Sequence, residues 1–69
     1  MNIYVFKTSV RKKDIHLVEL LLCSLIPKSN WNFDFEDRDN ILRVESVENV
    51  TAMISTNLKL GGFHCEELE

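Results

Sequence analysis

Trp31-Asn-Phe-Asp-Phe-Glu-Asp-Arg-Asp-Asn-Ile-Leu-Arg-Val-Glu45 is the stretch that decides the fold. Its first half alternates apolar with polar residues, a period of two that is typical of a strand with one apolar face, at Trp31, Phe33 and Phe35. Residues 37–40 are Asp, Arg, Asp and Asn, and Asp and Asn favour turns because their short side chains hydrogen-bond nearby backbone. Leu42 and Val44 then resume the apolar face. The stretch predicts a β-hairpin, which needs a helix or further strands against that face.

Composition indicates an ordinary globular protein. The chain has 69 residues, 45% of them apolar and 28% charged, so we expect one domain spanning residues 1–69. The net charge of −3 disfavours nucleic acid as a partner, because nucleic-acid binding calls for a basic surface. The longest apolar run falls far short of the ~20 residues that cross a bilayer. With no secretory signal after Met1 and only two cysteines, Cys23 and Cys65, we expect a cytoplasmic protein with both thiols reduced and buried.

The segment before the hairpin predicts a strand and a helix. Asn2–Thr8 alternates as a strand, with Tyr4 and Phe6 turned inward and Ile3 and Val5 on a less covered face. A basic connection leads into a helix expected from about Arg11 to Ile26, which Pro27 ends. The apolar arc of this helix is wider than one sheet face requires, because it also includes Leu17, Leu20, Cys23 and Ile26. Either loops cover these extra residues, or they leave an exposed patch of the kind that binds partners.

The segment after the hairpin repeats this order. Ser46 resembles the N-cap of a second helix, whose inward stripe comprises Val47, Val50, Ile54 and Leu58. Gly61 and Gly62 close the helix, and we expect one of them in the left-handed conformation. A last strand follows over Phe63–Glu67, with Phe63 and Cys65 on its inner side.

The resulting order is strand, helix, strand, strand, helix, strand. It predicts an α+β, ferredoxin-like βαββαβ sandwich, in which a four-stranded antiparallel sheet carries two helices on one face. Trp31, at the open end of the hairpin, is expected to be only partly buried. The predicted open face carries Ile3, Val5, Lys7, Asn32, Asp34, Glu36, Arg43 and Glu45. The predicted core comprises Tyr4, Phe6, Val18, Leu21, Leu22, Leu25, Phe33, Phe35, Leu42, Val44, Val50, Ile54, Leu58 and Cys65.

Nearly the whole chain resembles the heavy-metal-associated domain family, the small copper-chaperone fold. The resemblance is carried by Phe33-Asp34-Phe35-Glu36 leading to Leu42-Arg43-Val44, and by Ile54 and Leu58 preceding Gly62-Phe63. The family holds its metal with a Met-x-Cys-x-x-Cys loop after the first strand. Residues 8–14 of this chain, Thr-Ser-Val-Arg-Lys-Lys-Asp, contain neither cysteine nor methionine, so the thiolates that select Cu(I) are missing. The resemblance implies the fold without the metal site.

No other metal site is expected. His64 and Cys65 are neighbours in a strand and point to opposite faces, and His16 and Cys23 are two helical turns apart. The acidic residues of the hairpin, Asp34, Glu36, Asp37 and Asp39, do not follow a calcium-loop spacing.

Two functional classes, an enzyme and a binding domain, are compatible with the predicted topology. Acylphosphatases share the predicted topology, and Arg11 with Asn32 or Asn40 resembles their arginine and asparagine pair, but the loop around Arg11 lacks their glycines. We therefore expect no catalytic residue, cofactor or metal, and a non-enzymatic domain that binds a protein partner or itself. An acylphosphatase-like, phosphate-handling enzyme is the alternative function. The candidate interaction surface is Ile3, Val5, Leu17, Leu20 and Ile26.

Overall fold

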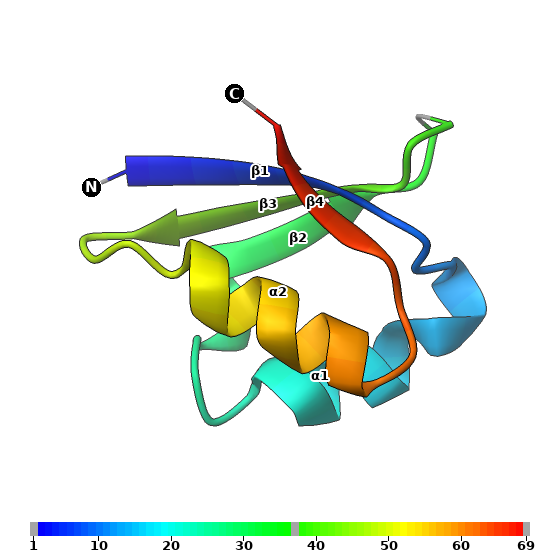
Figure 1. Cartoon of the computed structure of the whole chain (residues 1–69), viewed down its shortest axis with the longest axis horizontal. Helices are drawn as coiled ribbons and strands as arrows, with labels where there is room; N and C mark the ends of the chain where they lie inside the picture. Colours follow the sequence, from blue (N-terminus) through cyan, green and yellow to red (C-terminus); the bar gives the residue numbers. More distant parts are fainter. Residues whose placement is uncertain (1, 37, 69) are drawn as a thin grey trace.

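The computed structural model describes residues 2–36 and 38–68, and within them four strands form one antiparallel sheet with two α-helices on one face (Figure 1). The sheet order is β2-β3-β1-β4. Its strands are β1 (Asn2–Thr8), β2 (Trp31–Asp34), β3 (Ile41–Ser46) and β4 (Cys65–Leu68). The helices are α1 (Ile15–Leu22) and α2 (Thr51–Leu60), and short 3-10 turns, η1 (Lys12–Asp14) and η2 (Lys28–Asn30), precede α1 and β2. The predicted ferredoxin-like α+β fold is confirmed.

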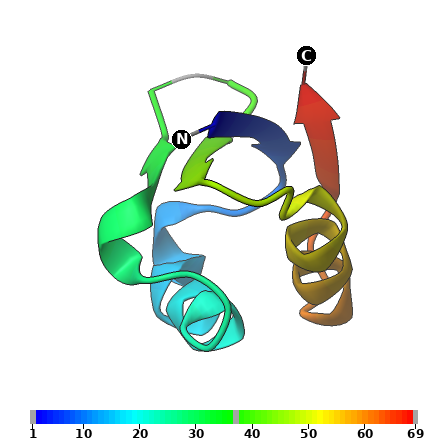
Figure 2. The ribbon, with the colours of Figure 1, turned by 90° about the vertical axis from the view of Figure 1, so that its left-hand side faces the viewer.

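The strand register separates the two faces of the sheet. Tyr4 of β1 lies opposite Val44 of β3, and Trp31 of β2 lies opposite the same residue from the other side, so these three share the face that the helices cover. Val5 lies opposite Arg43, which in turn lies opposite Asn32, and these three share the open face. Figure 2 shows both helices beneath one side of the sheet.

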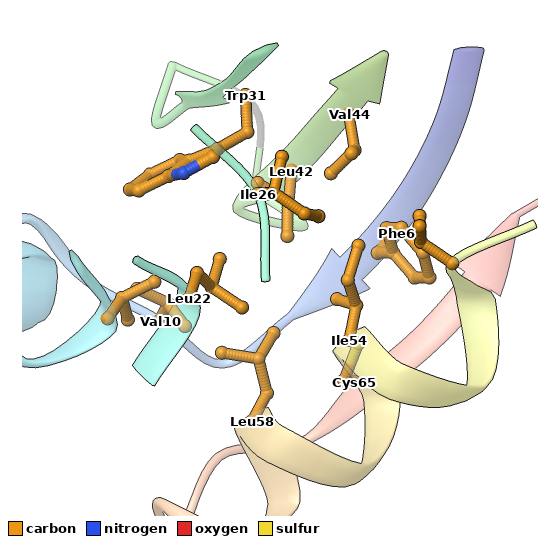
Figure 3. Packing of buried hydrophobic residues seen from close by; sticks show 12 residues of the cluster. Phe6, Val10, Leu22, Ile26, Trp31, Leu42, Val44, Ile54, Leu58 and Cys65 are labelled. Carbon is orange, nitrogen blue, oxygen red and sulfur yellow. The ribbon is translucent and has the colours of Figure 1, made fainter. Parts of the chain in front are cut away.

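The core lies between the helix layer and the sheet (Figure 3). Most of the predicted core is confirmed, whereas Tyr4, Leu21, Leu25, Phe33 and Phe35 are only partly buried at its border. The sequence missed Val10, Ile26 and Ile41, all of them buried. The buried hydrophobic residues are Phe6, Val10, Val18, Leu22, Ile26, Trp31, Ile41, Leu42, Val44, Val50, Ile54, Leu58 and Cys65.

The expectation that Trp31 is only partly buried is wrong, because its side chain is 5% exposed. The Lys28 Nζ lies 4.1 Å from the centre of the indole ring, an arrangement that favours a cation–π contact. The Phe33 ring packs edge-on against Trp31 at 5.8 Å. The η2 turn therefore closes the end of the hairpin that the sequence suggested was open.

The first helix is shorter than predicted. An α-helix forms only over Ile15–Leu22, preceded by the 3-10 turn η1. Beyond it, the N–H groups of Leu25 and Ile26 both donate to the carbonyl oxygen of Leu22. Pro27 prevents the chain from continuing as a helix, since it has no N–H to donate to a carbonyl four residues back and disfavours a helical residue before it.

The start of the second helix was predicted too early. Ser46 is the last residue of β3, and its hydroxyl accepts from the Glu48 N–H in the turn that follows. The side chain of Asn49 instead accepts from the N–H of Thr51, at 3.0 Å, where α2 begins. Val47 therefore lies outside the helix and is 73% exposed, so its place in the inward stripe is wrong.

The end of α2 is as predicted. Gly62 has a φ of +91°, the left-handed conformation. The Gly62 N–H donates to the Lys59 carbonyl and the Phe63 N–H to the Leu58 carbonyl, which is the bonding pattern of a Schellman cap. The last strand starts at Cys65, two residues later than predicted. Just before it, the Ser9 N–H donates to the His64 carbonyl and joins the segment after β1 to the segment before β4.

Candidate functional site

The predicted interaction surface does not form one surface. Ile3 is 64% exposed and Val5 is half-buried, and both lie on the open face of the sheet. Leu17 and Leu20 are exposed on α1, on the opposite side of the sheet. The structure therefore separates these four residues into two groups, one on the open face of the sheet and one in the helix layer.

Ile26 does not belong to either group. It is 3% exposed and packs in the core with Leu22 and Trp31 (Figure 3). The prediction that it contributes to an interaction surface is wrong, because the chain bends after Leu22 and turns the Ile26 side chain inward.

The helix layer carries exposed leucines from both helices. Leu20 is 73% exposed and Leu17 is 45% exposed on α1, and Leu60, at the end of α2, is 79% exposed. Leu21 of α1 packs closely against the backbone of Gly61, at the end of α2. A Cβ atom added to Gly61 would lie 2.5 Å from the Cδ1 of Leu21. This contact brings the end of α2 against α1. We call Leu17, Leu20 and Leu60 the helix-layer leucines.

Charge is divided between the two sides of the molecule. Five of the eight Lys and Arg residues precede or belong to the helix-side segments, and all five are exposed: Arg11, Lys12, Lys13, Lys28 and Lys59. The strands and the hairpin turn carry most of the carboxylates, including Asp34, Asp39, Glu45, Glu66 and Glu67. The side of the protein that presents the helix-layer leucines is thus the more basic one.

The open face of the sheet is largely occupied by ion pairs. The Lys7 Nζ lies 3.5 Å from an Asp39 carboxylate oxygen, and an Arg43 guanidinium nitrogen lies 3.7 Å from an Asp34 carboxylate oxygen. Ile41 lies opposite both Lys7 and Asp34 in the register, and it is buried although it is on this face. The ion pairs therefore lie beside the covered side chain of Ile41. The open face of the sheet offers an apolar partner less free surface than the helix layer does.

The outer edge of β2 forms a third surface. Among the described residues, β2 pairs only with β3, so its other edge has no neighbouring strand. A hollow of about 460 Å³ lies along this edge, and besides residues 32–36 it is lined by Lys12 of η1 and Arg43 of β3. The Phe33 and Phe35 rings are stacked at 5.1 Å with an angle of 11° and are only partly buried.

A smaller hollow of about 180 Å³ lies between α1 and η2. It is lined by Glu19, Cys23, Ile26, Lys28 and Trp31, and the Lys28 Nζ lies 3.5 Å from a Glu19 carboxylate oxygen at its border. The buried Nε1–H of Trp31 has no acceptor among the residues that the structure describes. This nitrogen is itself inaccessible, so the hollow offers a ligand chiefly apolar contact.

The two cysteines differ in environment. Cys23 is exposed, so the expectation that both thiols are buried is wrong for this residue, while Cys65 is buried beside α2. Burial raises the pKa of the Cys65 thiol from 9.0 to about 11, and the effect exceeds the opposing influence of the Lys59 charge and a hydrogen bond with Ser55.

We expect thiol reagents to distinguish the two cysteines. Cys23 should react with iodoacetamide in the folded protein near pH 8, whereas Cys65, protonated and covered, should react only after unfolding. Peptide mass spectrometry measures the labelling, and equal labelling rates at both cysteines would contradict the prediction.

The raised pKa of Cys65 also makes the stability of the protein depend on pH. Stability should be unaffected by Cys65 below about pH 9 and should fall as the pH rises toward 11, because only the unfolded thiol ionises in that range. A Cys65→Ala variant should lose this part of the pH dependence.

The candidate residues for metal or phosphate chemistry lie on different elements. Over residues 2–36 and 38–68, no three His, Cys, Asp or Glu side chains gather in a way that could hold a metal ion. Arg11 begins the η1 turn, where its N–H donates to the Asp14 carboxylate. Asn32 lies on the open face of β2, and the carbonyl of Asn40 accepts from the Thr8 hydroxyl in the hairpin turn. These three residues belong to three different parts of the fold.

Comparison with protein-family models, with curated proteins and with solved structures finds no match to this chain. The resemblance to heavy-metal-associated domains therefore remains a prediction from the residue pattern. None of the helices in the described part of the chain is long and apolar enough to cross a membrane.

Proposed function

We propose that this chain is a small, non-enzymatic protein-interaction domain that binds its partner through the helix-layer leucines. The observation that carries the proposal is the exposure of Leu17, Leu20 and Leu60, which come from two adjacent helices on one side of the protein. Exposed apolar side chains that gather on one surface favour association, because burying them removes apolar area from water.

The charge around these leucines defines the partner. Lys13 precedes α1 and Lys59 adjoins Leu60, and both are exposed. A protein whose apolar contact surface is bordered by Asp and Glu side chains complements this arrangement. An anionic membrane is the less favoured occupant, since the chain as a whole carries a net charge of −3.

The test compares the wild-type chain with the double variant Leu17→Ser/Leu20→Ser. Proteins retained from a lysate by the immobilised wild-type chain are identified, purified and titrated against both forms. Losing two exposed leucines from the contact should weaken binding at least tenfold, since each buried leucine contributes roughly 1.5 kcal/mol or more. Val47→Ser is the matched control, because Val47 is as exposed as Leu20 but lies outside both helices.

Two outcomes would overturn the proposal. One is equal binding of the wild type and the double variant by every retained protein. The other is leucine-dependent binding to vesicles of anionic lipid without any such binding to a purified protein, which would assign the surface to a membrane.

A further inference from the structure

The strand β2 is an edge that is complementary to itself. Edge strands in soluble proteins are usually protected from pairing by lysine, proline, a bulge, the shortness of the strand or a covering loop. Trp31–Asp34 is short, but it contains neither lysine nor proline, and its register with β3 runs without a bulge. Lys12 of η1 lines the hollow beside the strand but does not belong to it. The single charged residue of β2, Asp34, is in an ion pair with Arg43 within the same protein.

We propose that the occupant of this edge is β2 of a second copy of the chain, paired antiparallel about a two-fold axis at Phe33. A two-fold axis perpendicular to the sheet keeps the helix-covered faces of both copies on the same side. Side chains alternate between the two faces of a strand, so two residues that lie directly opposite each other must be an even number of positions apart in the sequence. With Phe33 on the axis, Trp31 lies opposite Phe35 of the second copy and Asn32 lies opposite its Asp34. The pairing joins the two sheets into one and gives the β2 edge of each copy a neighbouring strand.

The side chains match in this register. On the helix side, Trp31, Phe33 and Phe35 of the two copies form one row of rings, and aromatic cross-strand pairs are among those that stabilise a sheet. On the open face, the Asn32 amide can donate to the Asp34 carboxylate of the other copy. No like charges are directly opposed.

The other edge of the sheet does not match itself. Among residues 65–68, β4 carries Glu66 and Glu67 in succession. An antiparallel pair centred on either residue places that glutamate directly opposite its own copy, which is destabilising, so only the end residues of β4, Cys65 and Leu68, remain as centres. Of the two edges of this sheet, β2 is therefore the better suited to a second copy, because it can pair about its own interior.

The consequence rests on the proposed function of the helix layer. Because the two-fold axis is perpendicular to the sheet, both helix layers lie on the same side of the joined sheet. The dimer therefore presents two sets of helix-layer leucines in one direction. A partner with two binding surfaces, or two partners side by side, would gain affinity from this bivalent arrangement.

Sedimentation equilibrium of the reduced 69-residue chain over a range of concentrations tests the dimer without any partner. Asn32→Asp places two pairs of carboxylates in opposition across the axis and should raise the dissociation constant by between about twofold and thirtyfold. Asn32→Lys places a cation opposite each Asp34 and should lower the constant. Asn2→Asp, the same substitution at an exposed position of β1, is the control and should have no effect.

Disulfide formation tests the register in a Cys23→Ser background. Mixed Asn32→Cys and Asp34→Cys chains should cross-link to each other, whereas Asn32→Cys alone cross-links to itself only if the axis lies at Asn32. A chain that stays monomeric at all concentrations, or a dimer that ignores both Asn32 variants, would overturn the inference. The Leu17→Ser/Leu20→Ser variant should still dimerise, so failure of this inference and failure of the helix-layer proposal are distinguishable.

Discussion

Phe6→Ala is expected to lower the free energy of unfolding by about 3 to 5 kcal/mol, the usual cost of removing a buried phenylalanine side chain. Phe6 is fully buried in the middle of β1, where it lies opposite Leu42 and packs in the same cluster as Ile54 of α2 (Figure 3). The ring joins the sheet to the helix layer, so no neighbouring side chain can fill its space without moving an element.

This loss is large for a domain of 69 residues, whose total stability should be roughly 3 to 10 kcal/mol. The variant should be largely or partly unfolded in buffer, as measured by urea titration with Trp31 fluorescence. Ile3→Ala is the matched control, because Ile3 lies on the same strand but is exposed on the open face, and it should cost less than about 0.5 kcal/mol. Equal losses for the two variants would contradict the assignment of the buried face.

Thr8→Val is expected to destabilise the protein by about 2 to 4 kcal/mol although the two side chains have nearly the same shape, because it leaves buried polar groups unpaired. The Thr8 hydroxyl donates to the carbonyl of Asn40 at 2.7 Å and accepts from the N–H of Val10 at 3.1 Å. Thr8 and Val10 are buried, so water cannot easily replace the lost bonds.

The Thr8 bonds also hold two connections in place. Asn40 has a φ of +46°, which is uncommon for a residue other than glycine, and the hydroxyl fixes this turn against the end of β1. Thr8→Ser keeps the hydroxyl and loses only a methyl group, so it should cost about 1 kcal/mol. Thermal unfolding of both variants distinguishes the two effects. A serine variant less stable than the valine variant would show that the methyl group, and not the hydroxyl, is what Thr8 contributes.

The fold was predictable from the sequence because its strands alternate clearly and its glycines mark a helix end. The period of two in β1 and in the hairpin predicted both faces of the central strands, and the register confirms them. The Gly61-Gly62 pair predicted the cap of α2, which Gly62 forms. These signals are local, so a few consecutive residues are enough to predict them.

The boundaries of the helices were less predictable because competing local signals had similar strength. Ser46 is a good N-cap residue by type, but its pairing with Asn2 keeps it in β3, and α2 begins only after Val50, where the Asn49 side chain accepts from the Thr51 N–H. Ile26 and Trp31 became buried because η2 folds back over the end of the hairpin. That contact depends on the tertiary structure, and no periodicity in the sequence indicates it.

The candidate surfaces were predictable only in part. The wide apolar arc of the first helix left open whether loops cover Leu17 and Leu20, and the structure leaves both exposed. Leu60 was missed, although its position outside the stripe formed by Val50, Ile54 and Leu58 was a usable signal. The uncovered edge of β2 could not be predicted from residue pattern alone, because the sheet order decides which strands lie at the edges.

Association at the edge of β2 is tested most directly by hydrogen exchange of the wild-type chain at low and at high protein concentration. If two copies pair there, peptides covering Trp31–Asp34 should exchange more slowly at high concentration, while peptides covering Cys65–Leu68 should exchange at the same rate at both. Unchanged exchange in β2 would contradict the pairing, and slower exchange confined to β4 would place the interface at the opposite edge.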